Sequence, residues 1–123
     1  MNRIALIVDD SPSMRAMVAH TLASAGFEVL QGEDGRQATA FLDGRHIDVV
    51  VTDLNMPVMD GIALIKHIRA QPGYRFTPVL MLTTESQETR KLEGKKAGAT
   101  GWLVKPFNPE QLIAVVGKVV KQP

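Results

Sequence analysis

The chain has 123 residues, of which 45% are hydrophobic, and 14 lysines and arginines nearly balance 13 aspartates and glutamates. This length suits one domain, expected over residues 1–123, and a formal net charge of +1 gives no electrostatic footprint for nucleic acid or a membrane surface. Cysteine is absent, and the apolar run Ile4–Val8 is too short for a signal-peptide core. We therefore expect a soluble, cytoplasmic protein that binds neither nucleic acid nor membranes.

Short apolar runs alternate with helical patterns along the whole chain, which is typical of βαβ units in a parallel sheet. Strands are predicted at Arg3–Val8, Phe27–Leu30, Asp48–Thr52, Pro78–Leu82 and Thr100–Val104. Helices are predicted at Pro12–Ala25, Gly35–Leu42, Ile62–Ile68, Ser86–Ala97 and Pro109–Val120. Right-handed crossovers would fold these units into a three-layer α/β sandwich.

The helix predicted at Ser86–Ala97 is poorer in apolar residues than the others. Leu92 and Ala97 are almost its only ones, and Gly94 costs about 1 kcal/mol relative to alanine. The helix is a moving part or an ordinary solvated surface helix, and its composition is equally typical of both. Its basic side chains, which would dock an acidic partner or simply face solvent, are Arg90, Lys91, Lys95 and Lys96.

Four of the predicted strands run into residues that carry chemistry. Asp9 and Asp10 follow the first strand, Asp53 the third, Thr83 the fourth and Lys105 the fifth. Parallel strands bring these ends to one edge of the sheet. Helix capping or surface exposure explains each acid on its own, but explains less well why all of them lie at that edge. Oxygen ligands favour Mg²⁺, which needs only one or two carboxylates and leaves another free to attack phosphorus. The pattern therefore predicts a site for a divalent cation and a phosphoryl group.

These residues resemble the receiver domain of two-component response regulators. The matching motifs are Asp9–Asp10, DLNMPVMDG around Asp53, MLTTE around Thr83 and VKPF around Lys105. The resemblance covers essentially the whole chain, and it is closest to the stand-alone chemotaxis (CheY-like) type. It implies a doubly wound five-stranded parallel sheet of order 2-1-3-4-5 with helices on both faces, the flavodoxin-like arrangement.

The resemblance also implies roles for the acidic residues. Asp53 would accept a phosphoryl group from the phosphohistidine of a sensor histidine kinase. Asp10 and Asp53 would contact Mg²⁺ through their side chains, Asn55 through its backbone carbonyl and Asp9 through water. Asn55 and Glu85 would orient the water that hydrolyses the phosphoryl group, which predicts a short-lived signal.

The resemblance implies that the remaining residues would transmit the signal. Thr83 would hydrogen-bond a phosphoryl oxygen, and Lys105 would pair with it as a point charge. Trp102 stands where the family places its switch aromatic, commonly Tyr or Phe, and the Lys105–Pro106 peptide bond would be cis. Movement of Thr83 and Trp102 would change the face formed by the fourth helix, the fifth strand and the fifth helix.

On this interpretation the chain is a monomeric phosphoacceptor switch rather than a conventional enzyme. Its partners would be a histidine kinase, a target such as a flagellar motor switch protein, and a phosphatase. The alternatives are a phosphotransfer shuttle or phosphate sink in a phosphorelay, or less readily a small Mg²⁺-dependent phosphatase, whose second Asp is replaced by Asn55. Asp9 and Asp10 would repel a flavin phosphate, and residues 107–123 are too few for a DNA-binding domain.

Overall fold

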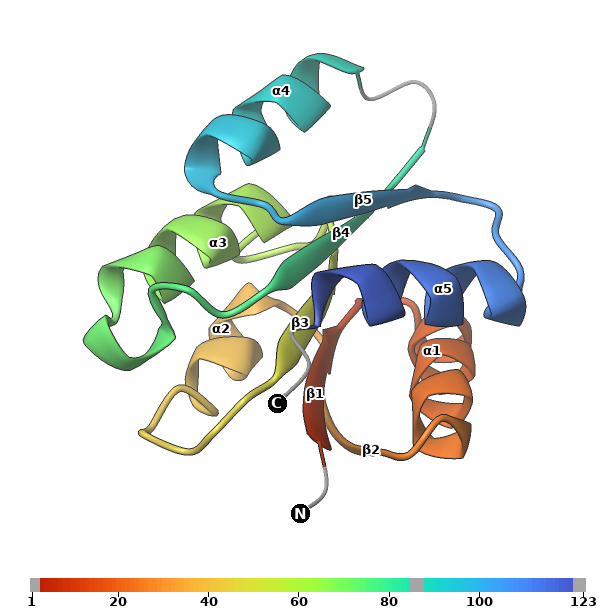
Figure 1. The fold of residues 1–123 in the computed structure, drawn as a ribbon. Coiled ribbons are helices and arrows are strands. Elements are labelled where there is room, and N and C mark those ends of the chain that lie inside the picture. The colour runs from red at the N-terminus through yellow and green to blue at the C-terminus, as the bar shows by residue number, and fades with distance from the viewer. Residues whose placement is uncertain (1–2, 85–87, 121–123) are drawn as a thin grey trace.

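The computed structural model describes residues 3–84 and 88–120, and in them five parallel strands form one sheet (Figure 1). The strands are β1 (Arg3–Val8), β2 (Phe27–Gly32), β3 (Val49–Asp53), β4 (Val79–Thr83) and β5 (Gly101–Val104). Their order is β2-β1-β3-β4-β5, which confirms the doubly wound arrangement expected from the sequence.

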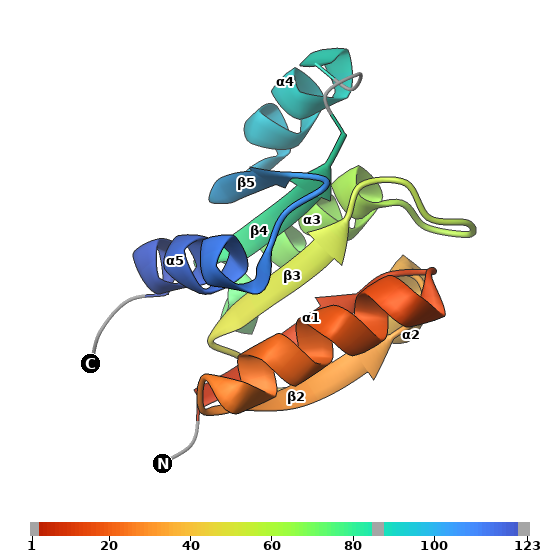
Figure 2. The ribbon, with the colours of Figure 1, turned by 90° about the vertical axis from the view of Figure 1, so that its right-hand side faces the viewer.

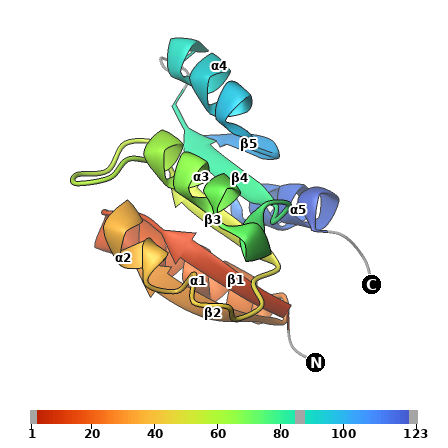
Figure 3. The ribbon, with the colours of Figure 1, turned by 90° about the vertical axis from the view of Figure 1, so that its left-hand side faces the viewer.

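Helices cover both faces of the sheet (Figure 2 and Figure 3). They are α1 (Pro12–Ser24), α2 (Gly35–Thr39), α3 (Gly61–Ala70), α4 (Glu88–Ala97) and α5 (Pro109–Val119), with a short 3₁₀ helix, η1 (Pro72–Tyr74). Helices α1 and α5 pack together on one face, whereas α2 and α3 cover the other, with α4 beside α3. Within the described residues, no helix has the length and hydrophobicity needed to cross a membrane.

The core consists of two apolar layers, one on each side of the sheet. The layer under α2 and α3 includes Leu6, Val50, Ile65 and Met81. The layer under α1 and α5 includes Ile7, Val51, Leu22 and Leu112. Because both faces are covered, Val49, Val50 and Val51 are all fully buried, as their unbroken apolar run predicts.

Several predicted boundaries are wrong by one to three residues. Strand β2 continues to Gly32, which pairs with Val8 of β1, and β3 and β4 are shifted by one residue so that each ends on its polar residue. Helix α2 stops at Thr39 rather than Leu42, because the chain beyond it continues with turn-like i→i+3 hydrogen bonds. Residues 86 and 87 of the predicted fourth helix lie outside the described residues.

Candidate functional site

Three carboxylates meet at the carboxyl-terminal edge of the sheet. Asp9 and Asp10 come directly after β1, and Asp53 ends the neighbouring strand β3. One carboxylate oxygen from each of the three lies within 4.8 Å of the others. Asp9 is fully buried, Asp53 is half-buried and Asp10 is exposed, so the cluster opens to solvent on the Asp10 side.

The Asp9 carboxylate has one satisfied oxygen and one unsatisfied oxygen. Its Oδ1 accepts a 2.9 Å hydrogen bond from the Ser11 backbone N–H. Its Oδ2 is buried, has no hydrogen-bond partner among the described residues, and lies 3.8 Å from Lys105 Nζ. Burial raises the pKa of Asp9, and the charges of Asp53 and Asp10 add to this, while the Ser11 N–H and Lys105 oppose it. A hydrated cation would supply the partner that Oδ2 lacks, so the donor set fits Mg²⁺.

Within the described residues, Asp53 is engaged through only one of its oxygens. Its Oδ1 accepts a 2.9 Å hydrogen bond from the Leu54 backbone N–H and lies 3.2 Å from Lys105 Nζ. Among the described residues, Oδ2 has no comparable contact, and the side chain is 14% exposed. The Asp53 carboxylate is therefore oriented by one oxygen, and the other has no comparable contact with the part of the chain that the structure describes.

Helix α3 approaches the end of β3 so closely that its first residue must be glycine. A Cβ atom on Gly61 would lie 2.5 Å from the Asp53 carbonyl oxygen and 2.8 Å from Met81 Sδ. The Gly61 N–H also donates a 2.9 Å hydrogen bond to the Leu54 carbonyl. This contact fixes the turn that follows Asp53, and it explains the glycine of the DLNMPVMDG motif.

Of the other residues predicted for the chemistry, those that the structure describes lie on the same edge or beside it. Thr83 is 2% exposed at the end of β4, and its carbonyl accepts a 2.6 Å hydrogen bond from the Lys105 N–H. Asn55 is exposed in the loop between β3 and α3, two residues after Asp53. Glu85 lies outside the described residues. The structure thus brings together Asp9, Asp10, Asp53 and Lys105, with Thr83 joined to Lys105 through the backbone.

The family model of the response regulator receiver domain matches residues 5–117 of the chain. The chain belongs to the response regulator receiver family. It is 41% identical to the chemotaxis protein CheY-3 of Vibrio cholerae over 118 residues, which cover 95% of this chain and 91% of that one. It is 40% identical to CheY1 of Helicobacter pylori over 109 residues, covering 87% and 88% of the two chains.

Solved structures show the same relationship for this receiver domain. Vibrio cholerae CheY4 is 52% identical, superposes with a TM-score of 0.92, and is covered completely by 98% of this chain. The receiver domain of a Pseudomonas aeruginosa sensor histidine kinase is 28% identical, with a TM-score of 0.88 and coverage of 97% and 98%. That structure has a magnesium ion coordinated in its active-site cleft.

Of the three predicted switch residues, Thr83 ends β4, Trp102 lies on β5 and Pro106 follows β5. The Lys105–Pro106 bond is cis, as the resemblance implies. Trp102 is half-buried, pairs in register with Met81 of β4, and packs on the apolar layer beneath α3. Its ring lies beside Gly94 and 5.9 Å from Lys91 Nζ, so its nearest neighbours include α4 rather than the acids of the receiver site.

Asp60 and Arg90 form a contact that the sequence analysis missed. Asp60 Oδ1 accepts a 2.9 Å hydrogen bond from the Ala63 N–H and so caps α3, while Oδ2 lies 2.7 Å from Arg90 Nη2 of α4. Burial raises the pKa of Asp60, but the Ala63 N–H and Arg90 outweigh it and lower the pKa overall. The Asp-Gly pair before an apolar run is a capping signal, whereas no local pattern indicates a partner 30 residues away.

A second contact of this kind ties the other end of α4. Arg69 Nη2 of α3 donates a 2.8 Å hydrogen bond to the Gly98 carbonyl, and its Nη1 donates one of 2.7 Å to the Thr77 carbonyl. Burial lowers the pKa of Arg69. Helix α4 of this receiver domain is therefore fastened to α3 at both ends by arginine side chains.

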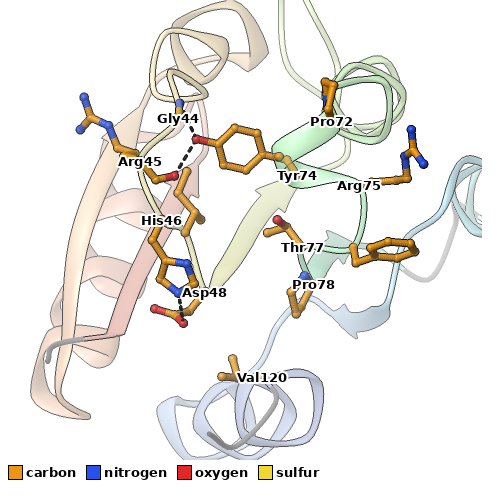
Figure 4. Close-up of a pocket in the computed structure, with 13 residues that line it drawn as sticks. Gly44, Arg45, His46, Asp48, Pro72, Tyr74, Arg75, Thr77, Pro78 and Val120 are labelled. Carbon is orange, nitrogen blue, oxygen red and sulfur yellow. Dashed lines mark hydrogen bonds and ion pairs between the residues drawn. The ribbon is translucent and has the colours of Figure 1, made fainter.

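A cavity of about 470 Å³ lies at the opposite edge of the sheet, where β3 and β4 begin (Figure 4). Its wall includes Tyr74, whose hydroxyl donates a 2.6 Å hydrogen bond to the Arg45 carbonyl. The Arg45 side chain is paired with Asp43 outside the cavity lining, and His46 lies 2.7 Å from Asp48. These polar groups have partners within the protein, whereas the buried Asp9 Oδ2 of the acid cluster has none among the described residues.

Proposed function

We propose that this CheY-like receiver domain accepts a phosphoryl group on Asp53 from the phosphohistidine of a sensor histidine kinase and thereby controls a partner protein. The observation that carries the proposal is the Asp53 carboxylate, oriented through Oδ1 by Leu54 and Lys105 while Oδ2 is available. The chemotaxis proteins among the relatives favour a target in chemotaxis, such as a flagellar motor component.

The reaction would depend on Mg²⁺ held by the acid cluster. Asp10 and Asp53 would bind it through their side chains, Asn55 through its backbone carbonyl and Asp9 through water. Support comes from the buried Asp9 oxygen without a hydrogen-bond partner among the described residues. When bound, the cation would offset the negative charge of the carboxylates and of the incoming phosphoryl group.

The transfer step follows from the position of Asp53. Its free carboxylate oxygen attacks phosphorus, the P–N bond of the phosphohistidine breaks, and the bonding electron pair stays with the imidazole nitrogen. The product is an acyl phosphate. Lys105 compensates its charge, and the Thr83 hydroxyl donates a hydrogen bond to a phosphoryl oxygen. Asn55 and Glu85 then orient the water that returns Asp53 to its carboxylate.

The output surface would be the face formed by α4, β5 and α5, which lie one above another in Figure 1 and Figure 2. Each of these elements carries an exposed large hydrophobic residue: Leu92 is 62% exposed, Val104 37% and Ile113 43%. Movement of Thr83 toward the phosphoryl group would reposition Trp102 and shift this face between two existing states.

Intact-protein mass spectrometry tests the proposal directly. After incubation with acetyl phosphate and Mg²⁺, we expect one phosphoryl adduct per molecule. Hydroxylamine should release it, as it does other acyl phosphates. No adduct should form when the metal is chelated before the incubation. Asp53→Asn should abolish the adduct. Asp43→Asn, on the exposed surface away from the cluster, is the matched control and should retain it.

Two results would overturn this assignment. An equal adduct on the Asp53→Asn protein would place the acceptor elsewhere. Hydrolysis of phosphate monoesters far beyond one turnover per molecule would indicate a phosphatase instead. Asn55→Ala and Glu85→Ala should each slow decay of the adduct, and unchanged decay would contradict their proposed role in hydrolysis.

A further inference from the structure

Helix α4 contains a buried glycine, although it lies at the surface. Gly94 faces the ring of Trp102 on β5. A Cβ atom at position 94 would lie 2.5 Å from Cη2 of the indole, 3.3 Å from Cζ2 and 3.5 Å from Cζ3. The first of these distances is shorter than real Cβ contacts, so any side chain at position 94 would collide with the outer edge of the indole.

The other helical glycine near this end of the chain is quite different. Gly117 in α5 is exposed, and a Cβ atom there would meet nothing within 4 Å. A glycine in such a position carries only the usual cost in helix propensity. The same intrinsic cost applies to Gly94, but there the missing side chain leaves the space that the indole fills.

Other contacts hold the ring and the helix together around this point. Lys91, one turn before Gly94, has its ammonium 5.9 Å from the centroid of the indole. The ends of α4 are fastened to α3 through the Arg90–Asp60 ion pair and the Arg69–Gly98 hydrogen bond. The indole therefore lies beneath a helix whose two ends are held by contacts with α3.

We propose that Gly94 is a positioning residue for Trp102, and that the absence of a side chain at position 94 couples the conformation of the indole to the position of α4. The contact itself is a property of the protein without phosphate. Its link to signalling rests on the proposed function, in which Trp102 moves in response to the phosphoryl group on Asp53.

The contact can be tested without any phosphodonor, because Trp102 is the only tryptophan and its fluorescence reports on this site alone. Gly94→Ala should shift the emission to longer wavelength, increase quenching by acrylamide and lower the melting temperature, despite the higher helix propensity of alanine. Gly117→Ala, the matched control, should raise the melting temperature and leave the emission unchanged. If Gly94→Ala behaves like Gly117→Ala, the proposal is wrong.

A rescue variant distinguishes this contact from a general defect in α4. Phenylalanine lacks the outer atoms of the indole that approach position 94, so Trp102→Phe should make room for a Cβ atom. In that background Gly94→Ala should raise the melting temperature, reversing the sign of its effect in the parent protein. A loss of the same size in both backgrounds would show that the indole is not the cause.

The link to signalling needs a separate measurement. Beryllofluoride with Mg²⁺, a mimic of the bound phosphoryl group, should change the Trp102 fluorescence of the parent protein. Gly94→Ala should form the Asp53 adduct with acetyl phosphate yet lose most of this fluorescence change. A change equal to that of the parent would refute the coupling. Failure of both proteins to form the adduct would refute the proposed function instead, while leaving the result for the unphosphorylated contact intact.

Discussion

The centre of the sheet and its β5–α4 edge are built in opposite ways. Every residue of β4 is buried, and β3 is buried except for a half-buried Asp53. Along β5 three residues are half-buried and one is exposed, and α4 leaves Leu92 62% exposed. The carboxylates thus stand on a tightly packed support, while β5 pairs with only one of the described strands and α4 is attached to α3 by a few side-chain contacts. In the proposed function the chemistry needs fixed geometry and the output surface moves, and this division suits both.

The largest expected contrast comes from removing one leucine side chain in each region. Leu80→Ala, on fully buried β4, should destabilise the protein by about 2–5 kcal/mol, because it removes apolar contacts and leaves a cavity. Leu92→Ala, on the exposed side of α4, should change stability by less than about 0.5 kcal/mol. Urea denaturation of both variants measures the difference, and equal losses would break the comparison.

Asp60 tests how the edge is attached to the site. Asp60→Ala removes both the α3 cap and the Arg90 pair and should cost about 1–2 kcal/mol. Asp60→Asn keeps an amide oxygen for the cap and should cost less. Since the pKa of Asp60 is lowered from 3.8 in the folded protein, its stabilising effect is present above that value and is lost as the pH falls through the lowered pKa.

Denaturation of the parent and the Asp60→Asn protein at a series of pH values checks this sign. The difference in free energy of unfolding between the two proteins should be constant at neutral pH and vanish in acid. A difference that persisted in strong acid would contradict the charge-based attachment of α4.

Asp9 tests the cost of placing charge in the packed centre. Its folded-state pKa is raised above 3.8, so the folded protein binds the proton more tightly, and stability falls as the pH rises through the raised pKa. Asp9→Asn should therefore raise the free energy of unfolding of the metal-free protein at neutral pH by about 1 kcal/mol. It should give no gain at a pH low enough to protonate Asp9. Thermal melts with and without Mg²⁺ should show the ion stabilising the parent more than the variant, and the reverse order would contradict the metal assignment.

The smallest expected effect concerns the loop between β3 and α3. Val58 has a φ of 69° and is 75% exposed, a conformation that a β-branched residue adopts only at a cost. Val58→Asn should stabilise the protein by up to about 1 kcal/mol, because asparagine tolerates this conformation. Val58→Leu is the control and should gain little. Equal gains from both would show that backbone strain is not the reason.

The sequence predicts the centre of this molecule much better than its edge. Asp9, Asp53 and Lys105 could be placed together because apolar runs define strands and parallel strands end at one edge. The cis bond before Pro106 followed from the family resemblance. The predicted Mg²⁺ ligation and switch roles remain predictions.

The edge could not be predicted in the same way, because its contacts join residues far apart in the chain. From the sequence, Gly94 indicates only a loss of helix propensity. In the structure, the Trp102 indole occupies the space that a side chain at position 94 would need. From the sequence, Arg90 is one of several basic residues at the surface. In the structure, it forms an ion pair with Asp60, the N-cap of α3. Local periodicity carries no information about which side chain from another element will fill such positions.

The shortness of β5 has a consequence for how molecules can associate with this domain. It is an outer strand of only four residues, and Pro106 follows closely with no N–H to donate. A long backbone ladder with an incoming strand cannot form along such a border. In the proposed function, a partner that binds on this side would contact side chains, which a signal can rearrange, rather than form permanent main-chain pairing.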